Sequence, residues 1–195
     1  MNRFLLATRN PHKTREFSEI LGEEFVVRDL SAEPDAPSIE ETGTTFEENA
    51  ILKAVAISKR VPGLVVADDS GLEVDALGGA PGIYSARYAG PDAKDNDNVA
   101  RLLLELRKLS IERPYRARFR CVLAVARDGK LLDTFVGVIE GAIVESPRGI
   151  GGFGYDPVFL PDGLTETFGE MDPGEKNRIS HRASAIRRLR AALLK

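Results

Sequence analysis

The sequence predicts an α/β fold, and three observations support this prediction. Apolar strand-like runs and helix-like segments are mixed along the chain, as in RFLLAT (3–8) followed by PHKTREFSEILG (11–22). Two long strand-like runs are joined by Asp128-Gly129, which predicts an antiparallel hairpin. No internal repeat or low-complexity linker interrupts the 195 residues, a length that suits one domain or two closely joined lobes that share a sheet.

The first half of the chain gives two strands and two helices. The strand at 3–8 leads into a helix with Phe17, Ile20 and Leu21 facing inward, and Gly22 ends that helix. Residues 31–45 are rich in proline and acids and predict a surface loop. Thr45 then precedes Glu48 at capping-box spacing, which opens a helix over 46–60. The run GLVVADDSG (63–71) predicts a buried strand that breaks into a turn.

The second half predicts loops, one hairpin and helices. Residues 77–91 form a glycine-rich stretch without a regular period, and 97–109 predict a helix. The hairpin spans 116–126 and 130–144 and is followed by a loop over 149–161. Asp172 and Pro173 predict a helix start, and Ser180 precedes a terminal helix.

Composition excludes several classes of protein. The formal net charge is −3, so no overall positive field attracts nucleic acid or an anionic membrane. The single cysteine, Cys121, lies in an apolar run and reads as a buried structural thiol, and no disulfide framework is expected. Neither a targeting segment nor an apolar run of membrane-spanning length is recognisable, which predicts a cytoplasmic, soluble protein.

The junction between the first strand and the first helix is a candidate anion site. Asn10 falls at the expected N-cap and Pro11 at the first helical position, so backbone N–H groups with partial positive charge gather there. Lys13 adds a full charge in the first turn. The pattern GxxxxGK[ST] is missing, which excludes a standard P-loop. On this junction alone, ordinary helix capping is the favoured explanation of the same residues.

Asp68 and Asp69 are candidate magnesium ligands. Adjacent residues of a strand point to opposite faces, so one carboxylate can enter a site while the other supports it. Carboxylates at the carboxyl end of a buried strand suit Mg²⁺, and Glu40 or Glu41 can supply a further ligand. An Asx turn made by Asp-Ser-Gly is the alternative.

Further candidates are one helix lysine and a late cluster. Lys53 shares an apolar stripe with Phe46 and Ala50, so it either snorkels or faces a buried anion. A structural alternative is pairing with residues one to two turns earlier: Glu47, Glu48 and Asn49. Phe153 and Tyr155 lie among glycines and can stack on a planar base, with Asp156 accepting hydrogen bonds. Three cationic residues are expected at helix starts: Lys176, His181 and Arg182. A positive charge at a helix start is not stabilised by the helix dipole, so this placement favours a role in ligand binding. For His181, the alternative is an ordinary surface histidine.

These segments together resemble the HAM1-like inosine triphosphate pyrophosphatase family, which includes the bacterial dITP/XTP pyrophosphatases. The resemblance rests on TRNPHK, EETGTTFEENAILKA, ADDSGLEVDALGGAPGIYSARYAG, GGFGYDPVF and ISHRASA, from the first strand to the terminal helix. Thr8, Asn10 and Lys13 match the family signature S/T-x-N-x-x-K. Arg9 occupies a position where many relatives carry glycine, and this difference could alter the phosphate contacts or the shape of the loop.

The resemblance implies Mg²⁺-dependent hydrolysis of ITP, dITP and XTP to the monophosphate and pyrophosphate. It implies a homodimer and an elongated two-lobed α/β fold around a long mixed sheet, in one pyrophosphatase domain over 1–195. Glu41 and Asp69 would hold magnesium, and Asp69 would be the proton acceptor. The residues that would contact substrate are Thr8, Arg9, Asn10, Pro11, His12, Lys13, Lys53, Ser70, Phe153, Gly154, Tyr155, Asp156, Lys176, His181 and Arg182.

Two other functions remain open from the sequence. A nucleotide sensor without catalysis would keep the pocket, but it has little need for a carboxylate pair beside a triphosphate. A nucleic-acid-binding module would use the arginines of the last helix, which the acidic net charge disfavours. For the hydrolase, a hydrogen-bond donor such as His181, Arg182 or a backbone N–H would favour the 6-oxo group of hypoxanthine and xanthine over the amine of adenine.

Overall fold

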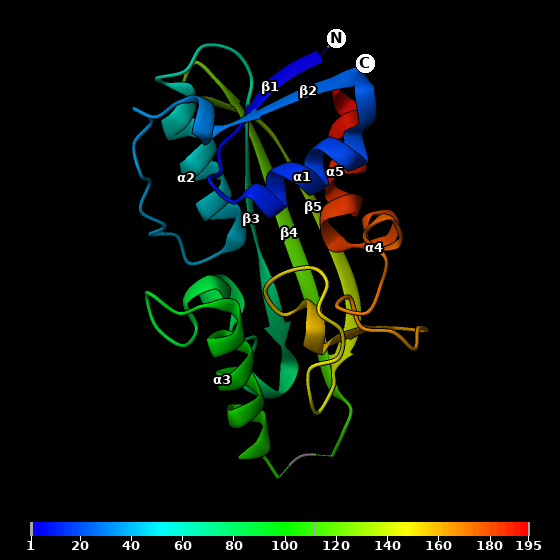
Figure 1. Ribbon diagram of the computed structural model, residues 1–195. Coiled ribbons are helices and arrows are strands. Elements are labelled where there is room, and N and C mark those ends of the chain that lie inside the picture. Colours follow the sequence, from blue (N-terminus) through cyan, green and yellow to red (C-terminus); the bar gives the residue numbers. More distant parts are fainter. Residues whose placement is uncertain (1, 111, 195) are drawn as a thin grey trace. The chain divides into compact units, whose positions relative to one another are not determined.

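The computed structural model describes residues 2–110 and 112–194, and they form a mixed α/β fold (Figure 1). The strands are β1 (Asn2–Leu6), β2 (Phe25–Asp29), β3 (Val65–Val74), β4 (Tyr115–Arg127), β5 (Lys130–Ile143) and β6 (Phe159–Pro161). The helices are α1 (Pro11–Leu21), α2 (Phe46–Ser58), α3 (Asp95–Arg107), α4 (Pro173–Ile179) and α5 (His181–Leu193). The predicted fold class is confirmed.

The sheet is mixed, with strand order β2-β1-β3-β4-β5-β6. β1 runs parallel to both neighbours, pairing Leu6 with Asp29 of β2 and with Val66 of β3. β4 and β5 are neighbours joined through Asp128 and Gly129, whose φ values of 51° and 74° suit a tight two-residue hairpin turn. The predicted hairpin is therefore confirmed, and β6 adds to it antiparallel to β5.

The chain divides into two compact units, and β3, β4 and β5 contribute residues to both. Unit 1 comprises Met1–Asp69, Cys121–Gly137 and His181–Lys195, and unit 2 comprises Ser70–Arg120 and Val138–Ser180. The core of unit 1 includes Phe4, Leu6, Phe17, Val66, Leu123 and Ile186. The core of unit 2 includes Leu72, Leu102, Phe119, Phe159 and Phe168.

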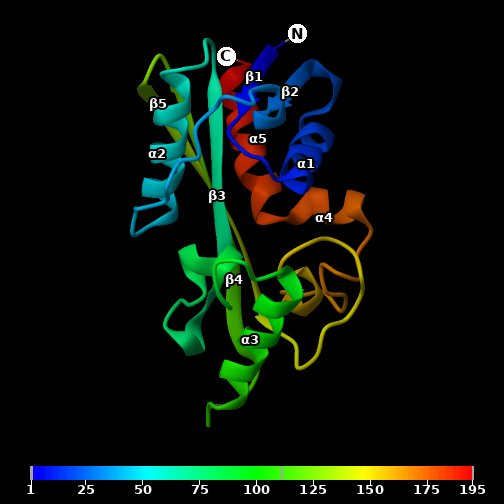
Figure 2. The same cartoon turned by 60° about the vertical axis from the view of Figure 1, so that its left-hand side comes forward.

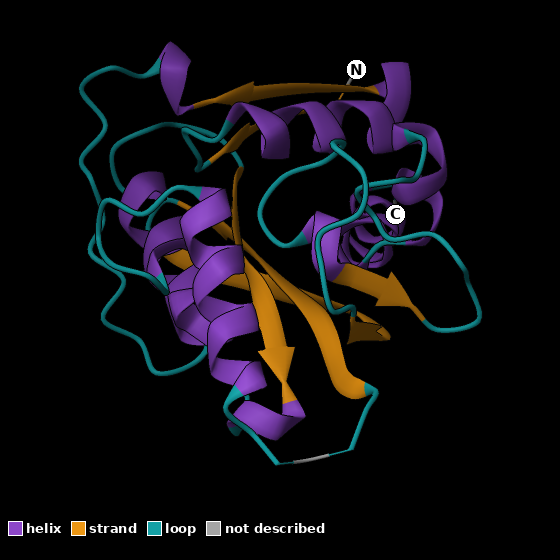
Figure 3. Cartoon of the chain, turned by 60° about the horizontal axis from the view of Figure 1, so that its bottom comes forward, coloured by secondary structure: helices purple, strands orange, loops and turns teal. Residues whose placement is uncertain are grey.

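Within unit 1, helices lie on both sides of the sheet. α1 packs against α5 and β2, and Figures 1 and 2 both show α1 and α5 side by side, with α2 on the other side of β3. The long stretch 33–45, drawn as loop in Figure 3, leads into α2. Because β3 is covered on both sides, its residues from Val65 to Asp69 are all buried. This arrangement decides which helix each carboxylate of β3 meets.

The prediction that the β3 strand ends with Asp68 and Asp69 and turns at Ser70 and Gly71 was wrong. β3 continues without interruption through Asp68, Asp69, Ser70 and Gly71 to Val74. Aspartate favours turns when its carboxylate bonds its own backbone, but here cations from the flanking helices hold both carboxylates. The backbone is thus left to the strand, and the carboxylates lie within β3 instead of at its carboxyl end.

Other differences are smaller. The 77–91 stretch contains a short 3₁₀ helix, Gly82–Arg87, and the segment expected as a loop over 149–161 ends in β6. α4 begins at Pro173, so Lys176 lies past its first turn and not at a helix start as predicted. The helix dipole therefore gives no reason to expect a ligand at Lys176. No helix in the described parts of the chain is long and apolar enough to cross a membrane.

Candidate active site

The junction of β1 and α1 has the predicted local structure. Asn10 is the N-cap of α1, its side chain accepts a hydrogen bond from His12 N at 2.9 Å, and Pro11 occupies the first helical position. The Thr8 hydroxyl accepts a hydrogen bond from Asn10 N at 3.1 Å. Lys13 then lies in the first turn, and its ammonium pairs with Asp68 on β3. The helix N-terminus and its lysine are thereby fixed to the central strand.

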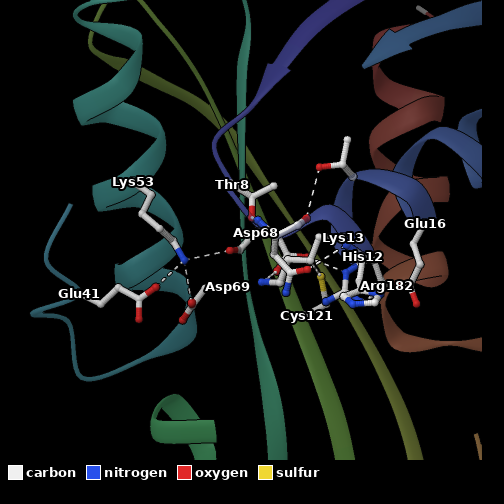
Figure 4. Close-up of polar contacts among 12 residues, drawn as sticks. Thr8, His12, Lys13, Glu16, Glu41, Lys53, Asp68, Asp69, Cys121 and Arg182 are labelled. Atoms are coloured by element: carbon white, nitrogen blue, oxygen red, sulfur yellow. Dashed lines mark hydrogen bonds and ion pairs between the residues drawn. The ribbon is translucent and has the colours of Figure 1, made fainter. Parts of the chain in front are cut away.

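Asp68 is the centre of a buried ion cluster on the side of β3 that faces α1 and α5. One carboxylate oxygen pairs with Lys13, and the other accepts hydrogen bonds from Arg182 Nε at 2.9 Å and the Cys121 thiol at 3.3 Å. Arg182 also donates to Glu16 at 2.5 Å from α1. The right-hand part of Figure 4 shows this cluster. It ties three elements of unit 1 together through charge.

Burial and charge oppose each other in this cluster, and charge prevails at Asp68. Burial alone would raise its pKa, but the charges of Arg182 and Lys13 hold the pKa of Asp68 well below its usual range. Burial, reinforced by the Asp68 charge, raises the pKa of the Cys121 thiol well above its usual value. The interpretation of Cys121 as a buried structural thiol is therefore confirmed.

Asp69 points to the opposite side of β3 and meets α2. Lys53 Nζ lies 2.8 Å from Asp69 Oδ1, 2.8 Å from Glu41 Oε1 and 2.9 Å from the Asp68 carbonyl oxygen. The left-hand part of Figure 4 shows the lysine between the two carboxylates. Lys53 pairs with the carboxylates of Glu41 and Asp69 and does not snorkel to solvent; that it also faces a bound anion stays a prediction. The expectation that the two aspartates serve opposite faces is confirmed.

The electrostatics of this second cluster leave Asp69 poised to accept a proton. Burial, assisted by nearby Glu41, raises the pKa of Asp69 against the opposing charge of Lys53. Burial would lower the pKa of Lys53, but Asp69 and Glu41 raise it, so the ammonium stays charged. Asp69 Oδ2 is buried and has no hydrogen-bond partner among the described residues. A carboxylate of raised pKa with one unused oxygen is suited to general-base chemistry.

The oxygens of this cluster are of the chemical type that binds magnesium. Within the described parts of the chain, no three histidine, cysteine or acidic side chains gather as a metal cluster. Mg²⁺ does not need one, because it commonly uses one or two carboxylates together with water and substrate phosphates. Glu41, Asp69 and the Asp68 carbonyl offer such hard oxygen donors around one cation, Lys53. Glu41, and not its exposed neighbour Glu40, makes this contact.

The loop that carries Glu41 is fastened at both ends. Arg9 Nη2 donates to the Ala36 carbonyl oxygen at 2.7 Å, which gives this unusual arginine a structural contact. At the other end, Gly43 N donates to Asn49 Oδ1 at 2.8 Å. Thr45 caps α2 by accepting from Glu48 N, as the capping-box spacing predicted. The loop therefore presents Glu41 from a defined backbone path.

Unit 2 contains a separate cluster around Asp156. Asp156 Oδ2 accepts hydrogen bonds from Lys176 Nζ at 2.6 Å and from Phe153 N at 2.8 Å. The Lys176 ammonium also lies 4.8 Å from the centre of the Phe153 ring. As predicted, Asp156 organises its loop by accepting hydrogen bonds. Gly152 has a φ of 71°, and a Cβ there would meet the Asp156 carboxylate at 2.0 Å, so only glycine fits.

Tyr155 does not offer a free ring face for stacking. Its side chain belongs to the core of unit 2, and its hydroxyl donates to the Ser85 carbonyl oxygen at 2.9 Å. Phe153 is only half-buried, so it alone of the two aromatic side chains keeps exposed ring surface. Gly154 N donates to Asp95 at 2.6 Å, which fixes the loop between them.

The structure groups the predicted residues by unit. The residues in unit 1 are Thr8–Lys13, Glu41, Lys53, Asp69, His181 and Arg182, and those in unit 2 are Ser70, Phe153–Asp156 and Lys176. His181 and Arg182 open α5 as expected, but both are buried, so the alternative of a surface histidine was wrong.

Sequence reasoning missed Glu16. Glu16 lies three residues after Lys13 on α1, a spacing that places both on one helix face, and this was the available signal. Asn49 was expected only as a possible partner of Lys53, and its contact with Gly43 was not predicted.

Fold and site together define an α/β protein in which β3 presents one carboxylate to each face of the sheet. Lys13 pairs with Asp68 on one face, and Lys53 pairs with Asp69 on the other. A family model described as the Ham1 family matches residues 4–192. The dITP/XTP pyrophosphatase of Bacillus licheniformis is 50% identical over 195 residues, covering 99% of this chain and 98% of the relative. That of Bacillus subtilis is 50% identical over 191 residues, covering 97% and 96%.

Solved structures agree with the family match. A HAM1 protein from Coxiella burnetii is 41% identical, with a TM-score of 0.89 over 100% of this chain and 99% of that one. The Ham1 protein of Staphylococcus aureus is 41% identical, with a TM-score of 0.86 over 99% and 98%. The chain belongs to the Ham1 family.

Proposed function

We propose that this chain hydrolyses non-canonical purine nucleoside triphosphates, namely ITP, dITP and XTP, to the monophosphate and pyrophosphate. Relatives named dITP/XTP pyrophosphatase match nearly the whole chain at about 50% identity, which supports this activity class. The observation that carries the proposal is the buried Asp69 carboxylate, which has a raised pKa and one oxygen that no other described residue contacts by a hydrogen bond.

Asp69 is the proton acceptor in this proposal. Water attacks the α-phosphorus, the bond from that phosphorus to the bridging oxygen breaks, and pyrophosphate leaves with the bond's electron pair. The proton of the attacking water goes to Asp69, which can accept it because burial raises its pKa. No covalent enzyme intermediate is needed.

The lysines and the α1 N-terminus neutralise the triphosphate. Lys13 lies in the first turn of α1, where the helix dipole adds partial positive charge. Lys53 keeps its proton, so it presents a full charge beside Asp69. Both charges stabilise the negative charge that grows on the departing pyrophosphate.

Magnesium is the proposed cofactor, with Glu41 and Asp69 as its protein ligands. A bound Mg²⁺ would supply Lewis-acid stabilisation of the phosphate oxygens. Asp69 Oδ2, which has no partner among the described residues, is the oxygen best suited to a new interaction.

The remaining assignments are also proposals. Ser70, Phe153–Asp156 and Lys176 would contribute to nucleotide binding, as would His181 and Arg182. Of these, Phe153 is favoured for base stacking because it retains exposed surface beside the Lys176 charge. We further propose that the two units act as one catalytic domain in a cytoplasmic homodimer, with neither nucleic acid nor membrane as partner.

The test is pyrophosphate release from ITP, XTP, GTP and ATP, with and without Mg²⁺, by wild type and by Asp69→Asn. Metal-dependent release from ITP and XTP that is lost in the variant would support both the reaction and its proton acceptor. Binding of ITP without release from any nucleotide would instead identify a nucleotide sensor and refute the hydrolase.

A further inference from the structure

Asn49 is a buried side chain of α2 that the mechanism above does not use. Its exposed fraction is 0%, and its Oδ1 accepts a hydrogen bond from Gly43 N at 2.8 Å. Gly43 lies in the loop before α2, two residues after Glu41. The contact therefore fixes the backbone next to a proposed metal ligand.

The loop lies directly against the first turn of α2 at this point. A Cβ added to Gly43 would lie 2.7 Å from Asn49 Oδ1 and 2.7 Å from Glu48 Cβ. The φ of Gly43 is not positive, so close approach, and not backbone strain, explains the glycine. One residue on, Thr44 N donates to the Glu48 carboxylate at 2.6 Å.

α2 holds Glu41 through two residues on one of its faces. Asn49 and Lys53 are four residues apart, so their side chains lie one above the other on the helix. Asn49 binds the loop backbone at Gly43, while Lys53 binds the Glu41 carboxylate at 2.8 Å and Asp69 at 2.8 Å. The backbone contact limits where the Glu41 side chain can reach.

The amide group of Asn49 is explained by its hydrogen bond with Gly43. Its Nδ2 is buried and has no acceptor among the described residues. An unpaired buried donor is unfavourable, and an apolar residue of similar size would avoid it. The bond from Gly43 to Oδ1 is the interaction that an apolar residue could not make.

We propose that Asn49 is a positioning residue, which holds the loop at Gly43 so that the Glu41 carboxylate stands beside Asp69 to bind a divalent cation. This inference rests on the metal role in the proposed function. Residues that orient metal ligands in this way typically change metal affinity by 10–100-fold when they are replaced.

The first experiment measures Mn²⁺ binding to the intact protein without nucleotide, by the loss of the free-ion electron paramagnetic resonance signal. Asn49→Ala should raise the Kd for Mn²⁺ roughly tenfold. Asn98→Ala is the matched control, because Asn98 is also buried and its Oδ1 also accepts one backbone N–H, that of Ala89, at 2.8 Å. This control should lose stability without losing Mn²⁺ affinity.

The second experiment breaks the same contact from the loop side. Gly43→Ala should weaken Mn²⁺ binding to a similar extent, and the double variant should be no worse than either single variant, because both remove one interaction. In pyrophosphate release from ITP, the Mg²⁺ concentration for half-maximal rate should rise while the rate at saturating Mg²⁺ stays close to that of wild type.

Two outcomes separate this inference from the proposed function. Unchanged Mn²⁺ affinity in folded Asn49→Ala, or an equal loss in Asn98→Ala, overturns the positioning role even if the wild type hydrolyses ITP. A wild type that binds Mn²⁺ through this loop but hydrolyses no nucleotide refutes the proposed reaction and leaves the positioning role standing.

Discussion

Replacing Lys176 by methionine should destabilise the protein through the buried charge that it leaves behind. The side chains of Lys176 and Asp156 are only 5% and 3% exposed, and their charged atoms lie 2.6 Å apart. Removing one partner of a buried ion pair costs about 3–5 kcal/mol, because the other charge stays desolvated. Methionine keeps the length and most of the packing of the lysine stem, so the lost charge dominates the effect.

The cost of the unpaired charge is expected near the lower end of that range, at about 3 kcal/mol. Asp156 retains the hydrogen bond from Phe153 N at 2.8 Å, which continues to stabilise its charge. Loss of the cation above the Phe153 ring adds about 0.5–1 kcal/mol. A loss of about 4 kcal/mol corresponds to a fall in Tm of about 8–16 °C for a chain of this size.

Thermal melting followed by circular dichroism measures this effect, with Arg178→Met as the control. Arg178 pairs with Glu175 on the same helix, but their side chains are 72% and 55% exposed, so its loss should leave Tm nearly unchanged. The double variant Lys176→Met/Asp156→Asn should recover much of the loss, since it removes the unpaired charge. Equal, small shifts for Lys176→Met and Arg178→Met would refute the reasoning.

Three further predictions follow from the ion clusters of unit 1. Asp69→Asn should lower pyrophosphate release about 10²–10⁴-fold with unchanged circular dichroism; a folded variant that releases pyrophosphate at the wild-type rate would contradict this. Asp68 has a lowered pKa, so its stabilisation is fully present above about pH 4 and is lost as the pH falls towards its folded-state pKa. Acid titration should show that the stability of Asp68→Asn depends less on pH in that window than the stability of wild type. Parallel stability curves would show that the ion pairs of Asp68 do not stabilise the fold. Cys121 should react with a thiol reagent only after denaturation, because the thiol is buried and its pKa is raised; rapid labelling of the native protein would show that it is accessible.

Local signals were sufficient for much of the fold and part of the site. Asn10 and Pro11 begin α1 as predicted, because capping depends on the residues at the junction itself. The Asp128-Gly129 hairpin follows from two residues that accept positive φ. The opposite orientation of Asp68 and Asp69 follows from the two-residue period of any strand.

Two features of the site depend on distant residues. The Asp-Ser-Gly turn signal is real in isolation, but ion pairs from α1, α2 and α5 satisfy the carboxylates and leave the strand intact. The burial of Lys176 depends on its pairing with Asp156, a residue twenty positions earlier. No local pattern encodes such partners.

The sequence by itself determined the fold class, the helix and hairpin boundaries that capping and turn residues set, and the set of residues from which a site could be built. Only the tertiary structure decided how those residues pair: Asp68 with Lys13 and Arg182, and Asp69 with Lys53 and Glu41. The physical reason is that caps and turns act over a few residues. By contrast, a buried charge takes its partner from whichever element packs against it, and for Asp68 and Arg182 that partner lies 114 residues away.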